Sequence, residues 1–160
     1  MRNLIFISLV LLSGSLLNGA IAQRNSNIGY YTIEPECLGV ELDGSVTLRS
    51  WGTGRNRLDA VDQAMKNAVY LVVFKGIQKG NPSCNLKPLL PEVNAETKYE
   101  PFFNDFFDDR AGKYKKFCSW RDERVHKKKH CKGLANSEMM TCSIIIRVLR
   151  SKLKDYLEEE

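Results

Sequence analysis

The residues most able to take part in covalent chemistry are the five cysteines: Cys37, Cys84, Cys118, Cys131 and Cys142. No two of them form a Cys-x-x-Cys pair, so their spacing indicates neither a thioredoxin-type redox site nor a zinc ribbon. The first residues of the chain predict export, and the thiols of exported proteins are usually oxidised. Because five is an odd number, at least one cysteine stays free or pairs with another chain.

We predict one disulfide, between Cys37 and Cys84. Cys37 ends a first expected strand, and Cys84 lies in a proline-bounded connection just after the longest expected helix. A strand that reverses in a tight turn and a helix that runs back would bring these two residues together. Cys142 falls on the apolar face of a strand and is expected to be a buried small residue. Cys118 and Cys131 flank a basic segment; either could be the reactive free thiol, and a bond between them is the main alternative pairing.

The only two histidines could contribute to a metal site. His126 and His130 would share one face of a strand, with Cys131 beside the second, and zinc and copper both take imidazole and thiolate ligands. However, the lysines at 127–129 would repel a cation, so a solvated basic edge is the favoured interpretation. We therefore assign no metal and no cofactor. No Ser-His-Asp or Cys-His arrangement is recognisable, so no catalytic residue is assigned either.

A basic segment directly follows an acidic one. Residues 110–132 hold ten basic side chains against two acidic ones, whereas residues 92–109 hold six acidic side chains and one lysine. With Phe117 and Trp120 nearby, the basic segment could bind an anionic polymer such as lipopolysaccharide, nucleic acid or acidic glycan. The candidate anion-binding residues are Arg121, Arg124, Lys127, Lys128 and Lys129. The favoured alternative is a lysine-protected edge strand that faces the acidic segment, and the net charge of +5 does not by itself imply nucleic acid.

The glycine-rich stretch Gly-Thr-Gly-Arg-Asn-Arg at 52–57 leads from an expected strand into an expected helix, which is where phosphate can bind. The dinucleotide-binding pattern needs a third glycine where this chain has Arg57, and the phosphate-loop pattern needs Gly-Lys-Ser/Thr. Neither pattern matches. The stretch is therefore interpreted as a tight turn between a strand and a helix.

The N-terminal residues have the features of an export signal. Arg2 is followed by an apolar run from Leu4 to Leu17 and by the small-residue cleavage pattern Ala-Ile-Ala at 20–22. The apolar run is shorter than the roughly 20 residues that a membrane-spanning helix needs. We expect a signal peptide at 1–22 and no transmembrane segment after its removal. Residues 23–160 are then expected to form a single α+β domain.

Seven elements are expected to position the cysteines and the charged segments. Strands are predicted at 30–40, 46–51, 116–129 and 139–149. Helices are predicted within the stretch 52–76, after its glycine turn, and at 96–109 and 151–160. In the longest helix, Asn56 is expected to cap the first turn and Gly76 to end the last one. Its apolar residues recur at steps of three and four, on one face: Leu58, Val61, Ala64, Met65, Ala68, Val69 and Val72. The predicted fold class is α+β, an antiparallel sheet of about four strands with the long central helix and the C-terminal helix packed on one face.

Two stretches carry a resemblance to known proteins: Glu-Cys-Leu-Gly-Val at 36–40, and the glycine turn with its helix at 52–68, GTGRNRLDAVDQAMKNA. They resemble uncharacterised exported proteins of Gram-negative anaerobes. The order of strand, glycine turn and helix is also similar to a group of bacterial envelope domains. This group comprises the N-terminal domains of the flagellar assembly protein of the T type and of the Tol-system B protein, and small outer-membrane lipoproteins. The chain lacks the lipid-attachment cysteine of the lipoprotein members.

The resemblance implies a small non-catalytic module of the cell envelope, used for assembly or protein contact. We therefore expect an exported protein of the periplasm or cell surface that binds an envelope protein partner and has no catalytic activity. Two alternatives stay open. One is a metal-binding protein or enzyme that uses His126, His130 and Cys131, and the other is an anionic-polymer-binding protein that uses the basic residues between 121 and 129.

Overall fold

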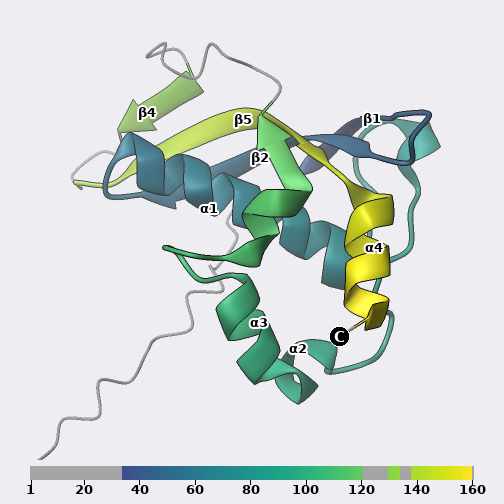
Figure 1. Ribbon diagram of the computed structural model, residues 1–160. Helices are drawn as coiled ribbons and strands as arrows, with labels where there is room; N and C mark the ends of the chain where they lie inside the picture. The colour runs from purple at the N-terminus through teal and green to yellow at the C-terminus, as the bar shows by residue number, and fades with distance from the viewer. Residues whose placement is uncertain (1–33, 121–129, 134–137, 160) are drawn as a thin grey trace, which may run out of the picture.

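Figure 1 shows the computed structural model of the protein, which describes residues 34–120, 130–133 and 138–159. The strands are β1 (Glu36–Val40), β2 (Val46–Gly54), β3 (Cys118–Trp120), β4 (Cys131–Gly133) and β5 (Met140–Val148). The helices are α1 (Arg57–Tyr70), α2 (Ala95–Lys98), α3 (Glu100–Phe106) and α4 (Arg150–Glu159). No helix within these ranges is long and apolar enough to cross a bilayer. The predicted signal peptide, 1–22, lies outside the described residues.

The strands form one antiparallel sheet in the order β1-β2-β5-β3, with β4 pairing the other end of β5. The central pair is β2 and β5, which run side by side from Val46 opposite Val148 to Gly54 opposite Met140. Each of these strands has nine residues. In each, buried residues alternate with more exposed ones, from Leu48 to Gly54 and from Cys142 to Val148, as expected of a strand with one covered face. The predicted class, α+β with an antiparallel sheet, is confirmed, and the sheet has five strands instead of about four.

The edge of the sheet beside β5 differs from the prediction. The sequence predicts one strand at 116–129 followed by a turn at 132–137. Instead, residues Lys113–Phe117 form a 3-10 helix, and within the described residues the strand comprises Cys118–Trp120. Lys132 and Gly133, the first two residues of the expected turn, belong to β4. β4 is held because Cys131 stands directly opposite Cys142 of β5 and is bonded to it. Residues 121–129 lie outside the described part of the chain.

The caps of α1 are those that the sequence predicts. The Asn56 side chain accepts a hydrogen bond from the backbone N–H of Asp59 at 3.0 Å. After α1 the chain makes one π-helical turn, Leu71–Lys75, and stops at Gly76, whose φ of 76° suits glycine. The predicted apolar face is buried with one exception: Leu58 is 69% exposed, because the buried run of α1 starts only at Ala60.

Glycines in β2 allow α1 to lie directly on the strand backbone. A Cβ at Gly52 would lie 2.2 Å from the carbonyl oxygen of Ala60 and 2.3 Å from the backbone nitrogen of Ala64. A Cβ at Gly54 would lie 2.5 Å from the backbone nitrogen of Ala60. Beside them, the buried Ser50 hydroxyl donates to the Ala64 carbonyl oxygen at 2.8 Å. Gly52 and Gly54 therefore belong to β2 and allow its close contact with α1. The predicted tight turn at 52–57 is shorter than expected: the chain leaves the strand only after Gly54, and Arg55 and Asn56 lead into α1.

Aromatic side chains fill the space beneath the C-terminal half of α1. The predicted helix at 96–109 is divided at Tyr99 into α2 and α3, and it ends at Phe106. Phe103 and Phe106 are fully buried, and the Phe103 ring lies 4.7 Å from that of Phe74. The aromatic spacing of this segment predicts that it covers either a sheet edge or the base of the main helix, and these contacts agree with the second.

Candidate functional site

One face of the sheet is not covered by any of the helices in the described residues. Figure 1 shows the labelled helices together on one side of β2 and β5, which leaves the opposite side of these strands open within the described part of the chain. We call this side the outer face. Its partly buried or exposed side chains are Arg49, Trp51 and Thr53 of β2, and Thr141, Ser143, Ile145 and Arg147 of β5. Thr47 of β2 lies on the same side but is buried. A surface built on two central strands is rigid and can present side chains in fixed positions.

The strand register places an aromatic and an aliphatic side chain at the centre of the outer face. Trp51 stands directly opposite Ser143, and Arg49 stands directly opposite Ile145. Trp51 and Ile145 are therefore diagonal neighbours, a separation across which large side chains still touch. Both are only partly buried. Tryptophan and arginine are the residue types that protein interfaces use most as anchors.

Hydrogen bonds and ion pairs hold the polar residues around this centre. Arg147 donates to the Asp43 carboxylate and to the Ser45 hydroxyl, each at 2.7 Å. The Ser45 hydroxyl and backbone N–H, assisted by Arg147, lower the pKa of Asp43 to about 2. At the other end, the hydroxyl oxygens of Thr53 and Thr141 are 2.8 Å apart. The rim of the outer face is thus preorganised, which reduces the entropy lost on binding.

The backbone of Trp51 is fixed from the helix side. β1 pairs with β2 only as far as Arg49. Beyond Arg49, the next carbonyl of β2 that points toward the β1 side of the sheet is that of Trp51, and no strand pairs with it there. The Asn67 side chain donates to this carbonyl at 2.6 Å, and Gln63 donates to the Asn67 side-chain oxygen at 2.8 Å. Two residues of α1 therefore take the place of a neighbouring strand, and they set the position of the tryptophan.

A second cluster of charged groups lies on the helix side of the sheet. The Lys66 side chain is only 3% exposed, and its ammonium group pairs with the exposed Asp109 carboxylate. Lys115 pairs with Asp62 at 3.0 Å. Both ammonium groups lie 5.7 Å from the centre of the Tyr114 ring. Burial raises the pKa of Tyr114 above its ordinary value. These contacts join α1 to the segment before β3, so the cluster acts as an anchor between two elements.

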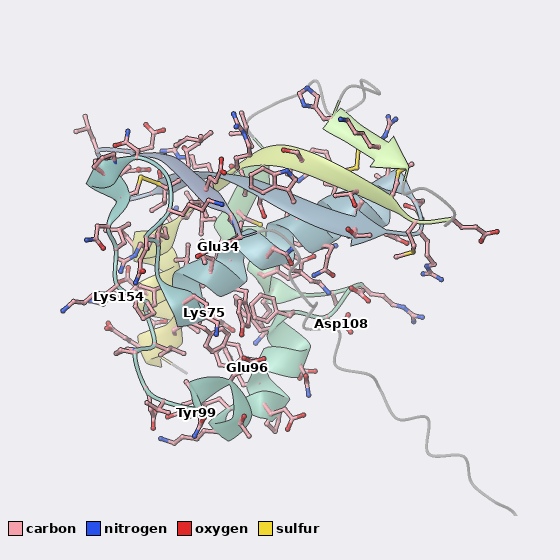
Figure 2. All side chains as sticks on the ribbon, turned by 180° about the vertical axis from the view of Figure 1, so that it is seen from behind. Glu34, Lys75, Glu96, Tyr99, Asp108 and Lys154 are labelled. Atoms are coloured by element: carbon pink, nitrogen blue, oxygen red, sulfur yellow. A yellow bond between two sulfur atoms is a disulfide. The ribbon has the colours of Figure 1, made fainter. Side chains whose placement is uncertain are left out.

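Two disulfides connect parts of the chain that are distant in sequence. Figure 2 shows them as yellow bonds, one beside β1 and the other between β4 and β5. The first joins Cys37 to Cys84, which is the pair predicted from the sequence. The second joins Cys131 to Cys142. Cys142 is buried, as expected, but it is not merely a small apolar residue, because it forms a disulfide. The alternative pairing of Cys118 with Cys131 is wrong. The cross-strand position of Cys142 opposite Cys131 explains the difference.

The remaining cysteine is buried. Cys118 is 9% exposed, and its thiol donates to the Tyr114 carbonyl oxygen at 3.4 Å. Burial raises the pKa of this thiol to about 12, so the thiolate is scarce at neutral pH. Of the two candidates for the free thiol, Cys118 and Cys131, the structure leaves Cys118 free. The expectation that this thiol is reactive is wrong, because reactivity requires both the thiolate and exposure.

We expect Cys118 to react only in the unfolded protein. The native, non-reduced protein should show almost no thiol toward Ellman's reagent at pH 8, and one thiol per chain after unfolding in guanidinium chloride. A Ser119→Cys variant is the matched control, since position 119 is exposed and should react at once. Rapid labelling of the native wild type would contradict the burial of the thiol. Absence of a thiol after unfolding would mean that Cys118 is bonded to another chain.

Several residues of the sequence-based hypotheses lie outside the described part of the chain. These are His126 and the candidate anion-binding residues Arg121, Arg124, Lys127, Lys128 and Lys129. His130 is described, but the disulfide leaves Cys131 without a thiolate for a metal. A metal site made of His126, His130 and Cys131 would therefore lack its sulfur ligand. Within the described residues, no group of three or more His, Cys, Asp or Glu side chains could hold a metal ion.

Comparison of the chain with protein-family models, with curated proteins and with solved structures finds no significant match. The resemblance to bacterial envelope domains therefore stays a hypothesis based on the two sequence stretches. The candidate site stands on the geometry of the outer face alone. Alternation along the predicted strand at 46–51 puts Arg49 and Trp51 on one side, but it does not identify them as binding residues. Their neighbours on β5, Ile145 and Ser143, are known only from the strand register.

Proposed function

We propose that the protein is an exported, non-catalytic binding or assembly module of the cell envelope, which holds a protein partner on the outer face of its sheet. The observation that carries this proposal is the position of Trp51 and Ile145 at the centre of a face that the described helices leave open. The two disulfides are compatible with an oxidising compartment outside the cytoplasm.

The chemistry around Trp51 favours a protein partner. A large apolar centre surrounded by polar groups is the usual anatomy of a protein interface, because the rim excludes water from the contacts at the centre. Here the rim holds hydroxyl groups and two arginines that already have acidic neighbours, Glu36 for Arg49 and Asp43 for Arg147. A partner segment with hydroxyl, amide and apolar side chains matches this surface better than a polyanion, which would have to compete with those carboxylates.

Site-specific photocrosslinking tests the proposal. Benzoylphenylalanine at Ser143 lies beside Trp51 on the outer face, whereas the same group at the exposed Lys152 of α4 lies on the helix side. In an envelope fraction, we expect a defined protein adduct from position 143 and none from position 152. Trp51→Ala should weaken the purified complex by about 30-fold, the loss of a typical interface hot spot.

Leu58→Ala is the matched control for the tryptophan variant, because Leu58 is also apolar and exposed but lies away from the outer face. It should leave the affinity unchanged, and the melting temperatures of both variants should stay close to that of the wild type. Equal adducts from positions 143 and 152, or an affinity that does not respond to Trp51→Ala, would exclude the outer face as the binding surface.

A further inference from the structure

The two disulfides differ in how readily a solvent molecule can reach their cysteines. Cys37 is 2% exposed and Cys84 is 1% exposed, so both ends of the first bond lie in the core. In the second bond Cys142 is fully buried, whereas Cys131 is partly exposed on β4. Thiol–disulfide exchange requires a thiolate to reach one of the two sulfur atoms. Of these four cysteines, Cys131 is therefore the most accessible to an attacking thiolate.

β4 has little to hold it in the sheet besides its disulfide. It is three residues long, and both Lys132 and Gly133 are exposed. A Cβ at Gly133 would meet no atom within 4 Å. Cys131 packs against the core, and the backbone of β4 pairs with Met140–Cys142 of β5. Because so short a pairing is marginal on its own, the disulfide is what fixes β4 in the sheet.

β3, which pairs with the same edge of β5, is held by side chains and by the segment before it. Cys118 is buried, and the indole N–H of Trp120 donates to the Met65 sulfur of α1 at 2.6 Å. Directly before β3, the Phe117 carbonyl oxygen accepts a hydrogen bond from the Leu149 N–H at 2.8 Å. Loss of the second disulfide is therefore expected to free β4 and to leave β3 in place.

The first disulfide does not control an element in this way. The Cys37 N–H donates to the Lys79 carbonyl oxygen, and the Cys37 carbonyl oxygen accepts from the Asn81 N–H, both at 2.9 Å. These bonds keep the connection after α1 beside β1 whether or not the sulfur atoms are joined. The two bonds of the protein thus differ both in access and in the consequence of breaking them.

We propose that the bond between Cys131 and Cys142 is a redox switch, which a dithiol reductant opens while the bond between Cys37 and Cys84 stays closed. A thiolate of the reductant attacks the Cys131 sulfur, a mixed disulfide forms, and the Cys142 thiolate leaves. The second thiolate of the reductant then attacks the reductant's own sulfur in the mixed disulfide, which releases Cys131. Two electrons pass to the cysteine pair, and the two protons of the dithiol end on Cys131 and Cys142.

Opening the switch changes one side of the outer face. Lys132 stands directly opposite Thr141, so its side chain lies on the outer face while β4 is in the sheet. Release of β4 removes this positive charge and leaves the edge of β5 unpaired from Met140 to Cys142. An unpaired edge of this kind can pair with an extended segment of another chain. The switch does not rest on the binding function proposed above, and it can be tested on the purified protein.

The order in which the disulfides are reduced tests the first part of the proposal. The oxidised mature chain is treated with dithiothreitol without denaturant, and samples are trapped with excess N-ethylmaleimide and mapped by mass spectrometry. The bond between Cys131 and Cys142 should open at least about tenfold faster than the bond between Cys37 and Cys84, which is the internal reference. Equal rates, or earlier opening of the first bond, would overturn the proposal.

Amide exchange followed by NMR tests the release of β4. A Cys131→Ala/Cys142→Ala variant represents the open switch, and its melting temperature shows whether it is folded. Among Met140–Cys142, the amides that face β4 should exchange at least about tenfold faster than in the oxidised wild type. The amides of residues 146–148, which pair with β3, should not change.

The matched control is a Cys37→Ala/Cys84→Ala variant, which should leave the exchange of Met140–Cys142 unchanged. The wild type after selective reduction should show the same faster exchange as the variant without the second bond, which separates release of β4 from any effect of the alanines. Exchange of Met140–Cys142 that stays as slow as in the oxidised protein would show that backbone pairing alone holds β4, and it would overturn the switch.

Discussion

Replacing Gly52 with alanine is expected to destabilise the protein by about 3 kcal/mol or more, at or beyond the upper end of the usual cost of overpacking. The added methyl group would lie 2.2 Å from the Ala60 carbonyl oxygen and 2.3 Å from the Ala64 backbone nitrogen. Both are backbone atoms of α1, which cannot move aside as a flexible side chain can. The helix would have to shift as a body, and the buried bond from Ser50 to Ala64 would lengthen with it.

Urea unfolding measured by circular dichroism gives this free energy directly. Gly39→Ala is the matched control, because a Cβ at Gly39 would meet no atom within 4 Å. Its free energy of unfolding should stay within about 0.5 kcal/mol of the wild type. If Gly52→Ala were as stable as Gly39→Ala, the close contact between β2 and α1 would be wrong.

The close contact also links the core to the candidate binding surface. Gly52 follows Trp51, whose carbonyl oxygen is bound by Asn67 of the same helix. A shift of α1 would therefore release the tryptophan backbone as well as the packing beneath it. We expect substitutions at the inner face of β2 to weaken partner binding even though they lie on the side away from the partner. The position of the tryptophan is a property of the strand–helix pair.

Periodicity was sufficient to predict the elements that are long and one-sided. The 3.6-residue period of α1 and the alternation of β5 each follow from burial of one side of the element. The pattern of apolar residues is therefore enough to predict a helix or a strand. The caps at Asn56 and Gly76 add local chemistry that does not depend on the rest of the fold. The class of the fold follows from these elements and their short connections.

The short edge strands could not be predicted in the same way. β4 has three residues and no period, and it exists because Cys131 meets Cys142 across the sheet. That meeting depends on the register of β5, which the sequence of β4 does not contain. The outer face presents a related difficulty. Alternation shows that Arg49 and Trp51 share a side, but a solvated face and a binding face have the same alternation.

The second large effect is expected from the disulfide between Cys37 and Cys84. Its sequence separation is 47 residues, and in the chain-entropy account closing a loop of this length is worth about 4 kcal/mol. The bond between Cys131 and Cys142, with a separation of 11 residues, is worth about 3 kcal/mol in the same account. A Cys37→Ala/Cys84→Ala variant should therefore unfold at a lower urea concentration than the wild type. Its free energy of unfolding should be lower by about 2–4 kcal/mol.

Values below the full entropic figure are expected, because the connection has other attachments to the fold. Cys37 exchanges two backbone hydrogen bonds with Lys79 and Asn81, and Ile77 is 1% exposed. These contacts survive removal of the bond and keep the connection near β1. Peptide mapping without reduction identifies the pairing independently of stability. A linked fragment that joins Cys84 to a cysteine other than Cys37 would refute the assignment. An intact pair whose removal costs no stability would instead show that the backbone contacts alone hold the connection in place.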